Sequence, residues 1–195
     1  LTGASVSDTD LSGARLEEAD LEDAVLSDVS LERADLRRAR LVRAMLLRTA
    51  AGGARLEGAD FAEAGLLDCD FDGADLSGAR LSGVMGRAVS LSGAVLREAD
   101  LRSCSLVEAG LDTADLSGAD LTQAVVMDTD MKTAHLRGAV VRMSDFSGCD
   151  FSGQDLSGAS LAQSTFKGAV LRACDLTGAD LSQCSFLEAD LSGAR

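Results

Sequence analysis

The 195-residue sequence contains no proline, tryptophan or tyrosine, only six phenylalanines and a single histidine. Leucine and alanine instead supply most of the hydrophobic residues, which make up 46% of the chain. One large aliphatic residue type and one small type fill a narrow, uniform interior better than a broad, irregular one. The composition therefore favours a narrow core with a repeated cross-section.

Long apolar runs and an excess of basic residues are also missing. No apolar stretch approaches the roughly 20 residues of a transmembrane helix, and no signal peptide is present. The 18 basic and 32 acidic residues give a net charge of −14. Direct binding to nucleic acid or to an anionic membrane is therefore disfavoured, whereas a basic protein partner is favoured. Because the chain lacks an initiator methionine, we expect a fragment of a longer protein with a flanking domain.

Residue types that carry chemistry form no recognisable site. His135 has no second histidine or nearby cysteine to share a zinc ion. We therefore expect no zinc site there and place His135 on the surface. The serines lack a base, and no glycine-rich phosphate loop is present. The number of cysteines is odd and none has C-x-x-C spacing, so we expect them to be small buried residues and not to form disulfides. Free cysteines favour a reducing, cytoplasmic compartment. Secretion of the protein as an effector is the alternative. These cysteines are Cys69, Cys104, Cys149, Cys174 and Cys184. We expect no enzyme, catalytic residue, cofactor or metal.

A period of five residues runs through the chain without insertion or deletion. Every fifth residue from 1 to 191, here called the centre, is Leu at 27 of 39 positions and Phe at six, and only Ala51 and Gly86 are not large and apolar. We expect Gly86 to mark a local distortion. The residue two before the centre, the inward position, is Ala in 25 of 39 units, and the residue between them, the outward position, is Asp in 16.

This period predicts short strands rather than helices. At about 100° per residue, a helix would scatter the leucines around its axis. In an extended chain, residues two apart share a face, so Ala and Leu point inward and Asp points outward. The second residue after the centre holds 16 of the 20 glycines, which is typical of the positive φ required in a type II turn. Alternating strands and corners predict a solenoid whose strands stack at about 4.8 Å.

The repeating unit A-D-L-x-x, as in Ala59-Asp60-Phe61 and Ala179-Asp180-Leu181, resembles the pentapeptide-repeat family over essentially the whole chain. The resemblance implies an all-β fold: a right-handed, four-sided parallel β-helix with four units per coil and about ten coils. We expect one domain, residues 1–195. Cys residues fall on the inward position, and Phe146, Phe166 and Phe186 would stack as a ladder inside it.

Residues 20 apart should be vertical neighbours on such a solenoid. One column then reads Asp20, Arg40, Asp60, Arg80, and a second reads Arg15, Asp35, Arg55, Asp75. Opposite charges on adjacent coils should pair, each pair contributing about 0.2–1 kcal/mol. This side of the first coils is therefore expected to be stabilising and solvated.

A neighbouring face carries apolar residues in two columns, one at the outward position and one at the residue after the centre, and is our candidate interaction surface. Its members are Val25, Met45, Leu47, Leu67, Met85, Val107, Val125, Met127 and Leu187. Exposed apolar patches of this kind mark sites where a partner binds. Alternatively, a flanking segment of the chain covers these residues, or they serve only the stacking of the strands. The ends carry no capping sequence, so a homo-oligomer through the side face or through the ends is a further expectation.

These observations predict a non-catalytic protein–protein interaction or scaffold module. The alternative comes from the resemblance: some family members mimic a DNA duplex, bind DNA gyrase or topoisomerase IV and protect it from quinolones. A net charge of −14 agrees with mimicry, whereas the arginines that interrupt the acidic columns argue against it.

Overall fold

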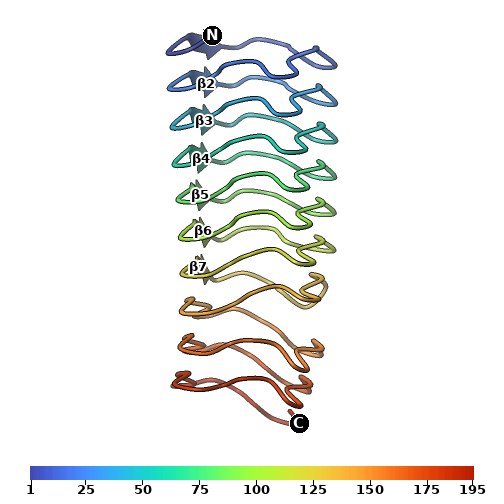
Figure 1. Cartoon of the computed structure of the whole chain (residues 1–195), viewed down its shortest axis with the longest axis vertical. Coiled ribbons are helices and arrows are strands. Elements are labelled where there is room, and N and C mark those ends of the chain that lie inside the picture. Colours follow the sequence, from blue (N-terminus) through green and yellow to red (C-terminus); the bar gives the residue numbers. More distant parts are fainter.

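Seven three-residue strands stack one below another in chain order in a computed structural model that describes all 195 residues (Figure 1). They pair in parallel, and each strand begins 20 residues after the previous one. The strands are β1 (Ser5–Ser7), β2 (Val25–Ser27), β3 (Met45–Leu47), β4 (Gly65–Leu67), β5 (Met85–Arg87), β6 (Ser105–Val107) and β7 (Val125–Met127). The structure contains no helix long and apolar enough to cross a membrane.

The other three faces repeat the same spacing in isolated parallel bridges, such as Asp20 with Arg40. Each coil therefore consists of four pentapeptide units, as the family resemblance implies, and the fold is an all-β parallel solenoid. The regular strands β1–β7 span six steps of 20 residues. This is fewer steps than the predicted number of about ten coils would give. Below β7 the same spacing continues as bridges, down to Val170 with Asp190.

The corners have the positive φ that the glycine pattern predicts. All 16 glycines at the second residue after the centre have φ between 62° and 77°. The sequence did not indicate that 22 other residues, among them Arg38 and Ala173 with φ of 55°, adopt the same backbone conformation. A left-handed conformation costs an L-residue about 1–2 kcal/mol. The coil-to-coil hydrogen bonds must offset that cost at each such corner.

Two kinds of corner occur. Most are closed by a hydrogen bond from the backbone N–H of the next inward residue to the carbonyl of the centre, as from Ala39 to Leu36 at 3.0 Å. The corners that follow β1–β7 lack this bond, and the next inward residue there is mostly Thr, Val or Cys. Lower in the same column, Ala169 and Ala189 close their corners at 3.1 Å. The first corner below β7 is also closed, by the Cys149 N–H and the Phe146 carbonyl at 3.2 Å, so the regular strands end where the corners of this column begin to close.

The outward aspartates support the corners. Each of the 16 accepts a hydrogen bond on its side-chain oxygen from the backbone N–H two residues later, as Asp150 does from Ser152 at 2.9 Å. This is the local arrangement that makes Asp favourable in turns. The regular spacing of Asp along the chain therefore has a structural cause.

The core is one continuous column of 54 buried residues, mostly centres and inward alanines. The predicted aromatic ladder is confirmed: the Phe146 and Phe166 rings stack at 5.8 Å, and those of Phe166 and Phe186 at 5.2 Å. The cysteines occupy inward positions as expected, four of them buried and Cys184 half-buried. The thiol of Cys149 donates to the carbonyl of Val126 at 3.2 Å, which explains how a polar atom is accommodated there.

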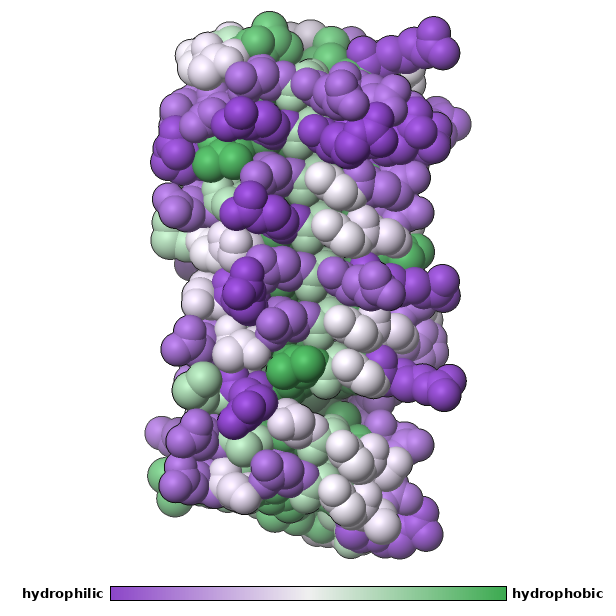
Figure 2. Space-filling view, in the orientation of Figure 1, coloured by the Kyte–Doolittle hydropathy of each residue, from purple (hydrophilic) through white to green (hydrophobic).

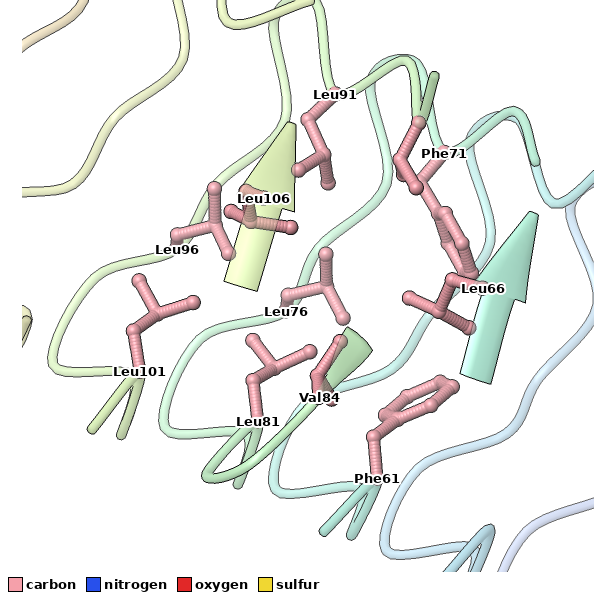
Figure 3. A pocket seen from close by; sticks show the side chains of 11 residues that line it. Phe61, Leu66, Phe71, Leu76, Leu81, Val84, Leu91, Leu96, Leu101 and Leu106 are labelled. Atoms are coloured by element: carbon pink, nitrogen blue, oxygen red, sulfur yellow. The ribbon is translucent and has the colours of Figure 1, made fainter. Parts of the chain in front are cut away.

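Gly86 does not distort the coil, so that expectation is wrong. It pairs in regular register with Leu66 above and Leu106 below. A Cβ on Gly86 would lie 2.8 Å from the Leu106 side chain, which leans into the vacant volume. Figure 3 shows leucine and phenylalanine side chains of several coils, among them Leu66 and Leu106, around an apolar space of about 20 Å³.

Candidate functional site: an apolar face on the parallel sheet

The strands position the candidate surface. Each three-residue strand places its centre in the core and its two flanking residues outside. Parallel pairing then sets Val25 beside Met45 and Leu47 beside Leu67. Eight of the nine predicted residues, from Val25 to Met127, therefore lie on β2–β7 in one sheet; we call this set the apolar face.

Exposure separates the members of the apolar face. Leu47, Val107, Val125 and Met127 are half-buried. The most exposed are Val25 at 43%, Met45 at 52%, Leu67 at 42% and Met85 at 66%. The exposed hydrophobic surface is therefore concentrated on β2–β5.

Leu187 does not join the apolar face. It is 59% exposed but lies three 20-residue steps below Met127 in the same column. Ser147 and Lys167 occupy the steps between them. The spacing alone placed Leu187 in the right column, but the intervening polar residues separate it from the rest.

Gly65 shapes the centre of the apolar face, and the sequence reasoning missed it. It lies between Met45 and Met85 in one column. A Cβ on Gly65 would be 2.6 Å from the Met45 sulfur, so the Met45 side chain lies across this glycine. The result is a shallow hollow lined by Met45, Gly65, Leu67, Met85, Arg87 and Val107 among others. The Met-Gly-Met order at 20-residue spacing was the available signal.

Charged pairs lie next to residues of the apolar face. Arg48 and Asp28 form a bidentate pair with N–O distances of 2.6 and 2.7 Å, and Arg87 reaches Glu108 at 3.4 Å. The Arg48 guanidinium lowers the pKa of Asp28, which keeps this carboxylate charged. An apolar centre with a polar, charged rim is the usual anatomy of a protein interface.

The adjacent side of the first coils is occupied by its own ion pairs. Arg80 binds Asp60 at 2.9 Å, as the alternating column predicts, whereas Arg40 binds Glu22 at 2.6 Å rather than a residue of its own column. Corner residues outside the two predicted columns also pair, notably Arg38 with Glu18 and Arg43 with Asp23. Figure 2 shows hydrophilic side chains crowded near this N-terminal end.

The residues considered for chemistry lie apart from each other. His135 is exposed, and the cysteines are spread along the inward column. No group of three or more His, Cys, Asp or Glu side chains is arranged to hold a metal ion. Burial raises the pKa of Cys104 to about 12, so this thiol is protonated and a poor nucleophile at neutral pH.

Comparison with known proteins agrees with the geometry. The family model for pentapeptide repeats matches in eight copies over residues 4–41, 52–84, 87–123, 114–153 and 155–193. HetL, a pentapeptide repeat protein involved in heterocyst differentiation regulation in the cyanobacterium Nostoc, is 30% identical over 100% of this chain and 87% of its own, with a TM-score of 0.54.

A second solved structure is similar in fold. QnrB1, a plasmid-mediated fluoroquinolone resistance protein, is 22% identical over 98% of this chain and 93% of its own, with a TM-score of 0.50. The sequence matches none of the curated proteins with which it was compared. The unbroken five-residue register, the four-unit coils and the family match together show that this chain belongs to the pentapeptide-repeat family.

Proposed function

We propose that this chain is a non-catalytic binding module that presents its apolar face to a protein partner. The observation that carries the proposal is the exposure of Met45, Leu67 and Met85 on successive strands of one sheet. Monomeric proteins rarely leave contiguous apolar patches uncovered unless these have a partner. Methionine side chains adapt to differently shaped partners, which suits them to such a surface.

Rigidity supports the same function. Parallel backbone pairing ties each strand of the apolar face to the strands above and below it. Five steps separate β2 from β7, so the face extends about 24 Å at the usual strand spacing. A surface that is already ordered loses little conformational freedom on binding. The solenoid thus acts as a preorganised support for its exposed side chains.

The test is a double variant, Met45→Asp with Met85→Asp. Asp is the commonest residue at the outward position, so the fold should tolerate both changes. We expect the variant to lose partner capture in cross-linking pull-downs, or self-association in light scattering. The matched control is Val95→Asp with Val170→Asp, which changes the same position on other faces. If the double variant and the control behave alike in both assays, the apolar face is not the binding surface.

An acidic mimic of DNA that binds gyrase or topoisomerase IV is the second candidate. The net charge of −14 favours it, as do three places where aspartates stack directly on aspartates. These are Asp100 with Asp120, Asp130 with Asp150, and Asp155 with Asp175.

Two features weaken the mimic. All these aspartates already accept corner hydrogen bonds. Cations also lie against them, since Lys132 contacts both Asp130 and Asp150, at 2.8 and 3.4 Å. A gyrase supercoiling assay with titrated protein separates the candidates. Inhibition that persists in the Met45→Asp/Met85→Asp variant would favour the mimic, and absence of inhibition would exclude it.

A further inference from the structure

The coil-to-coil ladder is interrupted at one internal place. Apart from the terminal step to Arg195, parallel bridges join all the remaining pairs of residues 20 apart at the outward positions of the four faces, but none joins His135 to Asp155. The coils above and below this step are regular, with bridges from Asp115 to His135 and from Asp155 to Asp175. Figure 1 shows the yellow and orange ribbons diverging at this level.

The interruption leaves backbone groups without partners in the chain. In the coil above, the N–H groups of Leu116 and Gly118 donate to the next coil at 2.8 and 3.0 Å. The equivalent N–H groups of Leu136 and Gly138 make no such bond, and the carbonyls of Asp155 and Ser157, which should receive them, accept none. Unpaired backbone donors face unpaired acceptors, as they do at two open strand edges.

Gln154 holds the two coils apart. It is the only glutamine on an inward position, which is otherwise small. Its side-chain amide donates to the carbonyls of Met131, Lys132 and Ala134, at 2.5, 3.0 and 2.8 Å. The Ala134 carbonyl would otherwise accept the Asp155 N–H. Gln154 therefore takes the place of the ladder hydrogen bond and wedges the step open.

The opened step is a cleft with polar sides and an apolar floor. Its volume is about 620 Å³, within the range of ligand sites, which is about 300–1,000 Å³. Residues 134–140 form one wall and residues 154–160 the other. Leu136, Ala139, Leu156 and Ala159 line both the cleft and an apolar space inside the solenoid. Leu136 is the only centre away from the ends that is not buried.

Arg137 supplies a charge preference. The other arginines that follow a centre and have an outward aspartate 18 residues later contact that aspartate, as Arg97 does with Asp115 at 2.5 Å. Arg172 and Asp190 repeat this at 2.5 Å. Arg137 stands 18 residues before Asp155 but forms no ion pair. An acidic residue placed in the cleft below His135 would lie where Arg137 can reach it.

We propose that this cleft binds an extended peptide segment of a partner as an added strand between the two coils. The segment carries a small residue, an acidic residue and a large apolar residue in succession. Its backbone pairs with Leu136 and Gly138 on one wall and with Asp155 and Ser157 on the other, which is recognition by strand addition. The acidic side chain meets Arg137, and the apolar side chain enters the floor. This site is separate from the apolar face.

The probe is a capped peptide with the sequence of residues 114–118, Ala-Asp-Leu-Ser-Gly, which already stacks on residues 134–138 from the coil above. It ends there because Val140 and Ser160 pair directly and close the step. Hydrogen exchange should show fast exchange at Leu136 and Gly138 in the free protein and at least tenfold slower exchange with the peptide. A peptide with Lys at its second position should bind at least tenfold more weakly. If both amides are already protected in the free protein, the cleft is closed and the proposal is wrong.

Gln154→Ala provides the decisive variant, because Ala is the commonest inward residue and should allow the ladder to close. We expect protected amides at Leu136 and Gly138 without peptide, and at least tenfold weaker peptide binding. The control is Gln163→Ala, which removes an exposed glutamine that pairs with Gln183 at a corner and should change neither readout. Equal peptide binding by Gln154→Ala and the unchanged protein would overturn the proposal. Binding should survive in the Met45→Asp/Met85→Asp variant.

Discussion

Phe166→Ala tests how the aromatic ladder stabilises the lower half of the solenoid. Phe166 is 1% exposed and contacts three other rings. It stacks on Phe146 at 5.8 Å and on Phe186 at 5.2 Å, and it meets Phe151 edge-on at 5.8 Å. No other phenylalanine of the chain has two stacked partners. Its removal should therefore disrupt more contacts between aromatic rings than any other single change in the chain.

The expected cost is about 4–5 kcal/mol of unfolding free energy. Truncating a buried Phe to Ala costs about 3–5 kcal/mol, and more where the site cannot collapse. Here hydrogen bonds from Phe166 and Val170 to neighbouring coils hold the wall in place. Each aromatic pair adds about 0.5–1.5 kcal/mol beyond its buried area. Phe186→Ala is the matched control: it is half-buried with one stacked partner, so about 2 kcal/mol is expected.

Urea denaturation followed by circular dichroism measures the total loss, and hydrogen exchange locates it. Because each repeat contacts only its neighbours, protection should fall in residues 141–195 while β2–β5 keep theirs. A loss for Phe166→Ala no larger than that for Phe186→Ala would refute the argument from stacking. An equal loss of protection in β2–β5 would refute the assumption of local stability.

Three further results are expected. Hydrogen bonds from Ser117 lower the pKa of Asp115 to about 2. The contribution of the Asp115 carboxylate to stability is therefore complete above about pH 4 and disappears as the pH falls towards 2. The urea midpoint of the natural protein should fall over this range, and that of Asp115→Asn should fall less. Burial raises the pKa of the Cys104 thiol to about 12, so this thiol should resist iodoacetamide at pH 8 until the protein unfolds. The half-buried Cys184 should react sooner. Equal reaction rates of the two thiols in the native state would contradict the burial argument. Ala173→Gly should raise the unfolding free energy by about 1 kcal/mol, because φ at this corner is 55°; a lower melting temperature in calorimetry would show that left-handed strain is not what matters there.

The roles of the outward aspartates show where pattern reading stopped short. Their orientation follows from alternation along an extended segment, but their hydrogen bonds to the corner backbone depend on a turn geometry that composition does not specify. Half of the acidic residues, 16 of 32, have this local role. The net charge is therefore weaker support for mimicry of DNA than it seemed from the sequence.

The periodicity of the chain is sufficient to predict the fold, because the alternation of inward and outward side chains and the glycine corners are properties of a few consecutive residues. The same periodicity correctly placed the cysteines and the phenylalanine ladder, and it assigned eight candidate residues to one sheet. It did not indicate that Met45 lies across Gly65, that Arg40 chooses Glu22, or that Gln154 opens a step of the ladder. Each of these depends on how two coils, separated by about 20 residues of chain, pack against each other. Only the tertiary structure decides such contacts, since side chains of similar size and charge have several partners within reach across a coil boundary.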